Sequence, residues 1–477
     1  MRNFRYIWLF GLLGTFALII VPVFVFLPKT AAPLDDPGSH VPVRSPGTDH
    51  SNLLSEPFET GPDVTRACLE CHEDAAHAVS QTVHWTWEGE PVQLPGREQP
   101  VTIGKKNQIN NYCIGIQGNE TGCTACHAGY GWEDESFDFD QVENIDCLVC
   151  HESTGGYVKG KQGLPVEGVD LLAAARSVSY PTRENCGSCH FNGGGGNGVK
   201  HGDLDQSLNF PSASLDVHMG DLDFQCIDCH QTQDHQISGR SISVSVDDAN
   251  QVHCTDCHSL DLHADERING HLDTVACQTC HIPRGAREYP TKMEWDWSQA
   301  GEDRGDDPHT YLKIKGSFVY EDNFVPVYSW YNGTASRYLL GDGINPDEVT
   351  SINRPGGNIE DPEAMIWPFK IHTAWQIYDS VYNYLIQPKT VGEGGYWTEF
   401  DWDLAARLGS EETGLPYSGS YGFTQTEMFW PLTHMVAPAG DALQCVSCHG
   451  DAGRIDWEAL GYHGDPIEWG GRTPDSP

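Results

Sequence analysis

The stretch Cys123-Thr-Ala-Cys126-His127 is one of eight copies of the pattern Cys-x-x-Cys-His in this chain. In this pattern two thiols bond to the vinyl groups of one haem, and the histidine binds its iron. Zinc sites and redox dithiols use Cys-x-x-Cys pairs too, but neither explains a histidine after every pair. The sequence therefore predicts eight covalently attached haem c groups.

The attachment residues are spread over most of the chain. The cysteine pairs are Cys68/Cys71, Cys123/Cys126, Cys147/Cys150, Cys186/Cys189, Cys226/Cys229, Cys254/Cys257, Cys277/Cys280 and Cys445/Cys448. The histidines predicted to bind the proximal side of each iron are His72, His127, His151, His190, His230, His258, His281 and His449.

The chain is strongly acidic, with 28 Lys and Arg against 68 Asp and Glu and a formal net charge of −40. Such a charge argues against binding nucleic acid or anionic lipid headgroups. Two interpretations stay open. The charge either keeps an exported protein soluble or helps it to dock a basic partner.

The N-terminus predicts export. Arg2 and Arg5 precede an uncharged run over residues 6–27, which is long enough to span a bilayer. We expect residues 1–28 to be a transmembrane anchor or signal and favour the anchor, because Thr30-Ala-Ala is a weak cleavage site. Residues 29–60 have the composition of a flexible linker. Haem attachment takes place outside the cytoplasm, so the remainder is expected to be periplasmic or extracytoplasmic, tethered to the cytoplasmic membrane.

The spacing of the motifs predicts the fold. Residues 61–290 hold seven motifs, including that of the expected catalytic haem, and leave room for one short helix and one loop per haem. We therefore expect a mainly α fold with extensive loops and little β-sheet, a multihaem cytochrome c architecture organised by packed haems. Residues 291–440 form an aromatic-rich, haem-poor segment expected to wrap the core, with one or two helices over 361–387. Residues 441–477 hold the eighth haem and a C-terminal tail.

The second ligand of each iron decides between electron transfer and catalysis. A haem that only carries electrons usually has two strong ligands, whereas a catalytic metal needs an open or weakly held position. Seven distal candidates lie close to motifs, which leaves one iron over; they are His84, His201, His218, His235, His263, His271 and His434. His77 is a rival to His84, and His50 or His253 could fill the eighth position.

Because one iron is left without a distal histidine, Cys113 and Lys200 become candidate functional residues. Cys113 is the only cysteine outside a motif, ten residues before Cys123, and has no disulfide partner in the chain. Buried free cysteines are usually inert, but a lone thiol beside a haem is a candidate reactive group. Lys200 follows a glycine-rich run; most lysines are surface cations, and a lysine binds iron only as the neutral amine.

Several longer motifs resemble the octahaem tetrathionate reductases. They are Gly104–Cys113, Cys123–Trp132, Cys147–His151, Gly193–Asp203, Asp216–Met219 and Val275–Pro283, within a resemblance that runs from about Pro62 to Gly450. The resemblance implies a reductase of sulfur and nitrogen oxyanions, including tetrathionate, nitrite and hydroxylamine. It further implies that the haem on His127 is catalytic, that Lys200 is its distal ligand and that Cys113 lies nearby, with His/His electron carriers elsewhere.

The expected partners follow from this interpretation. The substrate would be a small inorganic oxyanion, and electrons would come from a redox partner protein or a membrane quinol-linked donor. The N-terminal segment would contact the membrane, and no nucleic acid is expected. The alternative is a non-catalytic electron conduit of an anaerobic respiratory chain, in which all eight irons have two protein ligands.

Overall fold

The computed structural model describes residues 15–16, 37–112 and 115–472. They fall into two compact units, Met1–Arg44 with His253–Ala264, and Ser45–Val252 with Asp265–Pro477. The smaller unit contains the short helices η1 (Pro37–His40) and η7 (Cys254–Asp256), the second of which lies in the sixth haem motif. A search of the described ranges finds no helix that is long and apolar enough to cross a membrane. The expected anchor lies outside these ranges, except for Thr15 and Phe16.

The helices of the larger unit are short, and many carry or flank a haem motif. The α-helices are α2 (Gly61–Leu69), α3 (Ala75–Ser80), α4 (Val83–Thr86), α5 (Glu120–Cys123), α6 (Leu148–His151), α7 (Leu171–Arg176), α8 (Arg183–His190), α9 (Val217–Asp221), α10 (Cys226–Cys229), α11 (Glu266–Asn269), α12 (Cys277–His281), α13 (Tyr396–Glu399), α14 (Trp402–Thr413), α15 (Cys445–Cys448) and α16 (Pro466–Trp469). The 3-10 helices are η2 (Thr124–Cys126), η3 (Val142–Asn144), η4 (Lys161–Gly163), η5 (Gln206–Asn209), η6 (Ile242–Val244), η8 (Trp297–Gln299) and η9 (Ala439–Asp441).

The strands lie almost entirely in the haem-poor segment. They are β1 (Thr232–Gln233), β2 (Gln236–Ile237), β3 (Thr291–Asp296), β4 (Tyr311–Leu312), β5 (Gly316–Glu321), β6 (Val327–Tyr331), β7 (Ala335–Arg337), β8 (Thr350–Pro355), β9 (Met365–Asp379), β10 (Tyr384–Leu385) and β11 (Tyr421–Pro431). Apart from the β1–β2 hairpin, they form one nine-stranded sheet in the order β4-β5-β3-β9-β11-β8-β7, with β6 and β10 also paired to β9.

This sheet corrects two predictions. The expected mainly α fold with little β-sheet is wrong, because the sheet is large and mixed: β3 runs parallel to β9, and β8 parallel to β11. The helices expected over residues 361–387 are also wrong, because β9 pairs with β11 along its length, from Asp379 opposite Tyr421 to Phe369 opposite Pro431.

The physical reason lies in the composition of β9. Its aromatic and β-branched residues favour strands, and side chains on both faces are buried, which hides the alternation that identifies a strand in sequence. Trp367, Trp375 and Tyr378 happen to have near-helical spacing. In the strand, Trp367 and Trp375 share one face and Tyr378 lies on the other.

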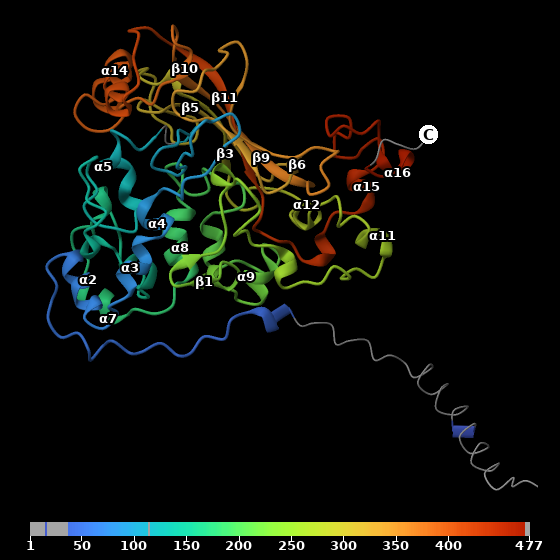
Figure 1. Ribbon diagram of the computed structural model, residues 1–477, viewed down its shortest axis with the longest axis horizontal. Coiled ribbons are helices and arrows are strands. Elements are labelled where there is room, and N and C mark those ends of the chain that lie inside the picture. The colour runs from blue at the N-terminus through green and yellow to red at the C-terminus, as the bar shows by residue number, and fades with distance from the viewer. Residues whose placement is uncertain (1–14, 17–36, 113–114, 473–477) are drawn as a thin grey trace, which may run out of the picture. The chain divides into compact units, whose positions relative to one another are not determined.

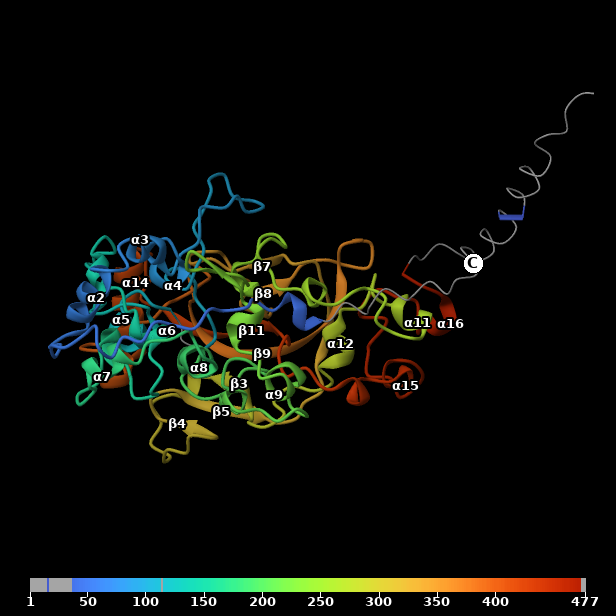
Figure 2. The same cartoon turned by 90° about the horizontal axis from the view of Figure 1, so that it is seen from below.

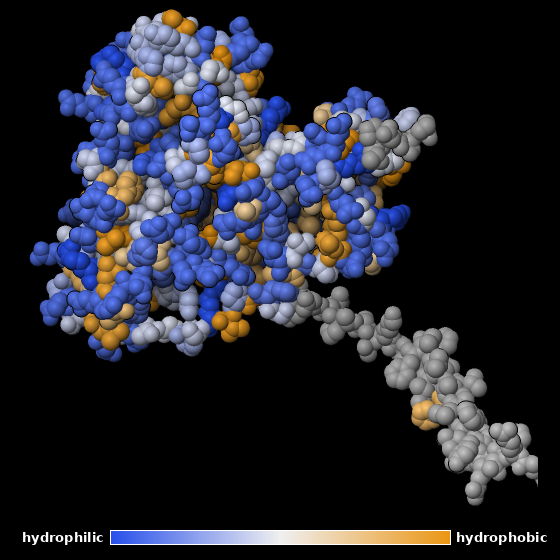
Figure 3. Space-filling view, viewed as in Figure 1, coloured by the Kyte–Doolittle hydropathy of each residue, from blue (hydrophilic) through white to orange (hydrophobic). Residues whose placement is uncertain are grey.

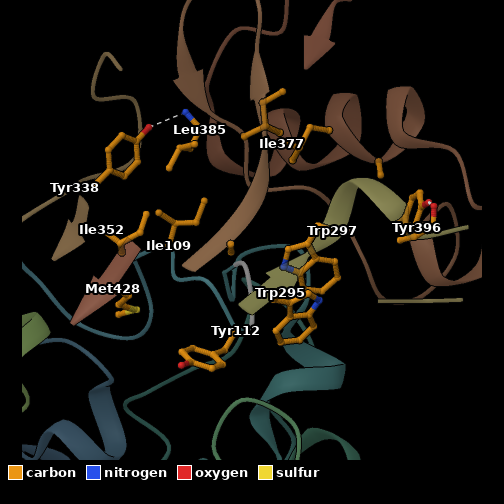
Figure 4. Close-up of a cluster of buried hydrophobic side chains, with 14 of the residues drawn as sticks. Ile109, Tyr112, Trp295, Trp297, Tyr338, Ile352, Ile377, Leu385, Tyr396 and Met428 are labelled. Carbon is orange, nitrogen blue, oxygen red and sulfur yellow. Dashed lines mark hydrogen bonds between the residues drawn. The ribbon is translucent and has the colours of Figure 1, made fainter. Parts of the chain in front are cut away.

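The sheet holds the segment that leads to Cys113. Gln376 donates to the Asn110 carbonyl at 3.0 Å, and Thr426 donates to the Asn111 side chain at 2.7 Å. Ile109 and Tyr112 belong to the same buried cluster as the tryptophans of β3 and η8 (Figure 4). The haem-poor segment therefore supports part of the haem region directly.

Within the larger unit, the helices near the first three motifs and those near the last one lie far apart. Figures 1 and 2 both show α2, α5 and α7 at one end and α15 and α16 at the opposite end. Part of the expected linker packs on the first group, since Leu54 and Phe58 contact the cluster around Leu148. The face drawn in Figure 3 is mainly hydrophilic, as the charge of the chain predicts.

Candidate functional site

Four pairs of histidine rings have the spacing that a haem iron requires. An iron–nitrogen bond of about 2.0 Å on each side, plus about 1.1 Å from nitrogen to ring centre, separates two opposed imidazole centres by about 6.2 Å. The observed centroid distances are 6.3 Å for His50–His72, 6.2 Å for His84–His190, 6.2 Å for His230–His434 and 6.3 Å for His271–His449. Each pair joins one motif histidine to one histidine from another part of the chain.

The hydrogen bonds of several of these rings, and of His151, also suit iron binding. Metal-bound histidines commonly donate one ring N–H to an oxygen and present the other nitrogen to the metal. Nδ1 lies within 2.6–3.2 Å of a main-chain carbonyl in His50, His151, His230 and His271, and of a carboxylate in His434 and His449. Nε2 is thereby left for the metal, so the donor set fits haem c.

The predicted attachment cysteines differ in their exposure to solvent. Cys71, Cys229 and Cys445 are exposed, whereas the other motif cysteines are partly buried, so these three depart from the enclosed sites that an architecture of packed haems suggests. The reason for Cys71 is its position in a turn that follows α2, outside any helix. Its amide still donates to the Cys68 carbonyl at 3.2 Å, which keeps both cysteines in one turn of the chain. The exposure of Cys71 therefore places the first motif at the surface, and its attachment role stays a prediction.

Several haem motifs, not all of them consecutive in the sequence, lie close together in the structure. The Cys189 Sγ donates to the Cys126 carbonyl at 3.9 Å, and before haem attachment the interaction of the two side chains lowers the pKa of Cys126 to about 6 and raises that of Cys189. The side chains of Cys68 and Cys147 interact in the same way, as do those of Cys186 and Cys226; the pKa of Cys68 and Cys226 falls and that of Cys147 and Cys186 rises. These pairs connect the first motif to the third, the second to the fourth, and the fourth to the fifth. This proximity is what electron transfer between haems needs.

The predicted distal ligands fall into different environments. His84, His271 and His434 form the ring pairs given above, while His235 lies near His151, which helps burial to lower its pKa. Of the other three, His201 lies 4.8 Å from the Trp430 ring, His218 is near Asp216, and His263 belongs to the smaller unit.

The structure also pairs one histidine that the sequence placed in a linker. The surroundings of His50 are rich in Pro, Gly and Ser, and no pattern in the sequence indicates its contact with His72.

The second motif differs from the others. His127 is fully buried, and its Nε2 lies 2.6 Å from the Trp85 carbonyl, while Nδ1 has no hydrogen-bond partner among the described residues. The rings of Trp85 and Trp132 lie 5.1 and 4.8 Å from the imidazole. Burial is the main cause that lowers the pKa of His127 to about 4, so the ring is neutral at pH 7.

A cavity of about 160 Å³ lies among the segment 105–110, Lys200 and residues of η6, β8 and β11. Its cations are Lys105 and Lys200, its polar neighbours include Gln108 and Asn110, and Trp430 forms part of its apolar wall. Lys105 connects the cavity to the second motif through Trp87, whose ring lies 3.9 Å from the Lys105 Nζ and 5.5 Å from the His127 ring. Two cations at a cavity in so acidic a chain indicate an anionic ligand.

Lys200 is held by the sheet. The Nζ of Lys370, on β9, donates to the carbonyls of Val199 and Lys200, both at 3.0 Å, and to the Thr291 hydroxyl. The Nζ of Lys200 then lies 4.7 Å from the centre of the Trp430 ring. Gly193 leaves room for the Lys200 stem, because a Cβ there would lie 3.1 Å from its Cδ.

Unpartnered polar atoms surround Tyr112, the last described residue before Cys113. The Tyr112 ring stacks on His372 at 3.9 Å. The Tyr112 hydroxyl, both nitrogens of His372 and the Trp430 indole nitrogen are buried without a hydrogen-bond partner among the described residues. Buried polar atoms without partners are rare and costly, at about 1–3 kcal/mol each, and here they adjoin the cavity wall. Cys113 itself lies outside the described residues.

Lys292 gives a pH-dependent test of this buried region. Burial, with smaller effects of Lys315 and Lys370, lowers the pKa of Lys292 to about 6. Between that pH and its ordinary pKa of about 10.4, the unfolded chain binds one proton more, so stability rises with pH by up to about 1.4 kcal/mol per unit. From pH 7 to pH 9 we expect wild type to gain up to about 2.7 kcal/mol in urea unfolding relative to Lys292→Met. Parallel pH curves would contradict the lowered pKa.

Comparisons with known proteins agree with this geometry. A family model described as bacterial cytochrome c matches residues 292–452. An uncharacterized protein of Archaeoglobus fulgidus is 26% identical over 245 residues, covering 41% of this chain and 82% of that protein. The crystal structure of octaheme cytochrome c from Shewanella oneidensis is 48% identical with a TM-score of 0.84, covering 90% of this chain and 99% of that chain. The chain therefore belongs to the octahaem c-type cytochromes.

Proposed function

We propose that this exported cytochrome is a reductase of small sulfur or nitrogen oxyanions, acting at the cavity beside the second motif. Tetrathionate, nitrite and hydroxylamine are its candidate substrates. The observation that carries the proposal is the pair Lys105 and Lys200 at a cavity that Lys105 connects, through Trp87, to His127, in a chain with a net charge of −40. The apolar N-terminal run would tether the enzyme to the membrane that supplies its electrons.

The residues around the cavity would share the work. Lys105 would balance the negative charge of the substrate, and Lys200 would add to this once its amine leaves the iron and is protonated. The amides of Gln108 and Asn110 would orient the oxygens of the substrate. Trp430 would exclude water from one side. Haem c, when bound, supplies electrons and an iron at which Lys200 would be the distal ligand.

Tyr112, Cys113 and the adjacent His372 of β9 would take part in proton transfer and sulfur chemistry. Nitrite and hydroxylamine reduction consume protons, which Tyr112 and His372 are placed to hold near the cavity wall. Cleavage of tetrathionate into two thiosulfates takes two electrons and no proton. For that reaction Cys113 would act as a nucleophile or temporary sulfur carrier.

The remaining haems would carry electrons. The ring pairs support His50, His84, His434 and His271 as second ligands opposite His72, His190, His230 and His449. The location of His235 supports the same role opposite His151. His201, His218 and His263 stay predictions as distal ligands.

A non-catalytic conduit is a second candidate, and the pairing of His50 favours it. His50 supplies a ligand beyond the seven that the sequence suggested, so every iron could have two protein ligands. The conduit would leave Lys105 and Lys200 without a role at the cavity.

Electron paramagnetic resonance of the oxidised holoprotein, with and without nitrite, separates the two functions. For a reductase we expect one iron outside the His/His class whose signal changes with nitrite. Viologen-driven turnover of tetrathionate, nitrite and hydroxylamine then identifies the substrate. Eight His/His signals that ignore nitrite, together with no turnover of any of the three, would establish the conduit instead.

A further inference from the structure

Three large apolar side chains are exposed around the eighth haem motif. Val446, inside the motif, is 77% exposed, and Ile467 and Trp469 on α16 are 65% and 71% exposed. Exposed apolar residues that are scattered singly need no explanation, but a cluster of them on a soluble surface marks an interaction site. Figures 1 and 2 both show α15, which holds Val446, next to α16.

This apolar cluster is connected directly to a haem ligand. Asp465 accepts from His449 Nδ1 at 2.6 Å and from the Gly450 amide at 2.6 Å. Its side chain also caps α16 by accepting from the Ile467 amide at 3.0 Å. The residue that orients the proximal histidine of the eighth haem therefore also positions Ile467 and Trp469.

The segment that carries these side chains is rich in exposed carboxylates, which we call the acidic rim: Asp441, Asp451, Asp456, Glu458 and Glu468. The two arginines of the segment are turned to main-chain carbonyls: Arg454 donates to Pro283, and Arg472 to Ile359. Arg267 on α11, four residues before His271, is exposed but is paired with Asp265 at 2.6 Å. The segment is therefore negative, and it complements a positively charged partner.

The position in the larger unit suits the transfer of electrons to or from outside. This end lies opposite α5, which leads into the second motif, in both views. The seventh motif lies next to this segment, since the Leu443 amide donates to the Cys280 carbonyl at 3.0 Å. The His271 ring lies 6.3 Å from the His449 ring, the spacing that a haem iron requires.

We propose that Val446, Ile467 and Trp469, with their acidic rim, form a docking face for a basic electron-transfer protein. We call it the eighth-haem face. Its apolar centre would contact the partner over a small area, as is typical of transient redox complexes, and the rim would steer the encounter. Electrons would pass one at a time between the partner and the eighth haem.

A stopped-flow experiment tests the eighth-haem face with a defined probe. The holoprotein is reduced with dithionite, freed of excess reductant and mixed with a ferric, basic monohaem cytochrome c at low ionic strength. One electron leaves the protein and reduces one probe iron from the ferric to the ferrous state. For the double variant Ile467→Ser/Trp469→Ser, we expect the second-order rate constant to fall about tenfold, since steering and contact at the patch set it.

The matched control is Val381→Ser/Tyr382→Ser, which removes two other apolar side chains that are 62% and 51% exposed. It should react like wild type, and reduction by dithionite should be equally fast in all three proteins. For the rim, Glu468→Lys should slow the probe reaction, and Glu399→Lys, exposed on α13, should not.

A face variant that reacts at the wild-type rate, or a control slowed as much as the face variant, would overturn the proposal. The assay needs no substrate turnover, so its result is independent of the proposed reductase function.

Discussion

Replacement of Lys200 by methionine is expected to lower turnover of the proposed substrate at least about 100-fold, the usual loss when one charge-stabilising donor is removed from an active site. Lys200 is one of two cations at the cavity, and its Nζ lies over the Trp430 ring. Methionine keeps the length of the apolar stem but removes the amine. The variant therefore loses both substrate attraction and the proposed iron ligand, and one signal in the paramagnetic resonance spectrum should change.

The matched control is Lys313→Met, which removes the same charge at a position that pairs with the exposed Asp303 and does not line the cavity. It should retain wild-type turnover and spectrum, because long-range effects of one surface charge are screened. If Lys200→Met keeps both the spectrum and the rate, Lys200 has no role at the second haem. If both variants lose activity alike, the effect belongs to net charge rather than to position.

The haem motifs could be predicted from sequence because their chemistry is local. Five consecutive residues provide both thiols and the proximal histidine, so no knowledge of the fold is required. The second ligands are different. His50 and His72 are 22 residues apart, whereas His271 and His449 come from opposite sides of the sheet segment in sequence, and only folding reveals such pairs.

The sheet could not be predicted because its central strand buries polar residues: His372 and Gln376 are buried, whereas Trp375 between them is exposed. Lys370 and His372 lie on a buried face of β9 among aromatic residues, so polar side chains occur where a core pattern predicts apolar ones. Their burial makes sense only next to Tyr112 and the Val199–Lys200 main chain, two segments distant in sequence. The resemblance to known reductases pointed to Lys200 but gave no indication of the lysine that holds it.

Replacement of Lys370 by methionine is therefore the sharpest test of how the fold builds the site. Lys370 is fully buried, and its amine joins the carbonyls of Val199 and Lys200 to the Thr291 hydroxyl. Without it, the Lys200 carbonyl loses its donor, at about 1–3 kcal/mol, while the Val199 carbonyl keeps the Thr291 hydroxyl at 3.2 Å, and the main chain at Lys200 can shift. A displacement of about 1 Å at a catalytic group costs about 100-fold, so we expect turnover to fall between tenfold and 100-fold although Lys200 is intact.

Two further measurements distinguish a loss of Lys200 positioning from a general loss of structure. The same haem signal that Lys200→Met alters should change in Lys370→Met, while the other haem signals and the circular dichroism spectrum stay as in wild type. Lys313→Met is the control, because it removes a lysine that pairs with the exposed Asp303, and such surface pairs contribute at most about 1 kcal/mol. Normal turnover and an unchanged signal in Lys370→Met would show that the Lys200 loop holds its position without the sheet. Loss of every haem signal would mean that Lys370 supports the whole fold, and Lys200 would then owe its position to something broader than one buried amine.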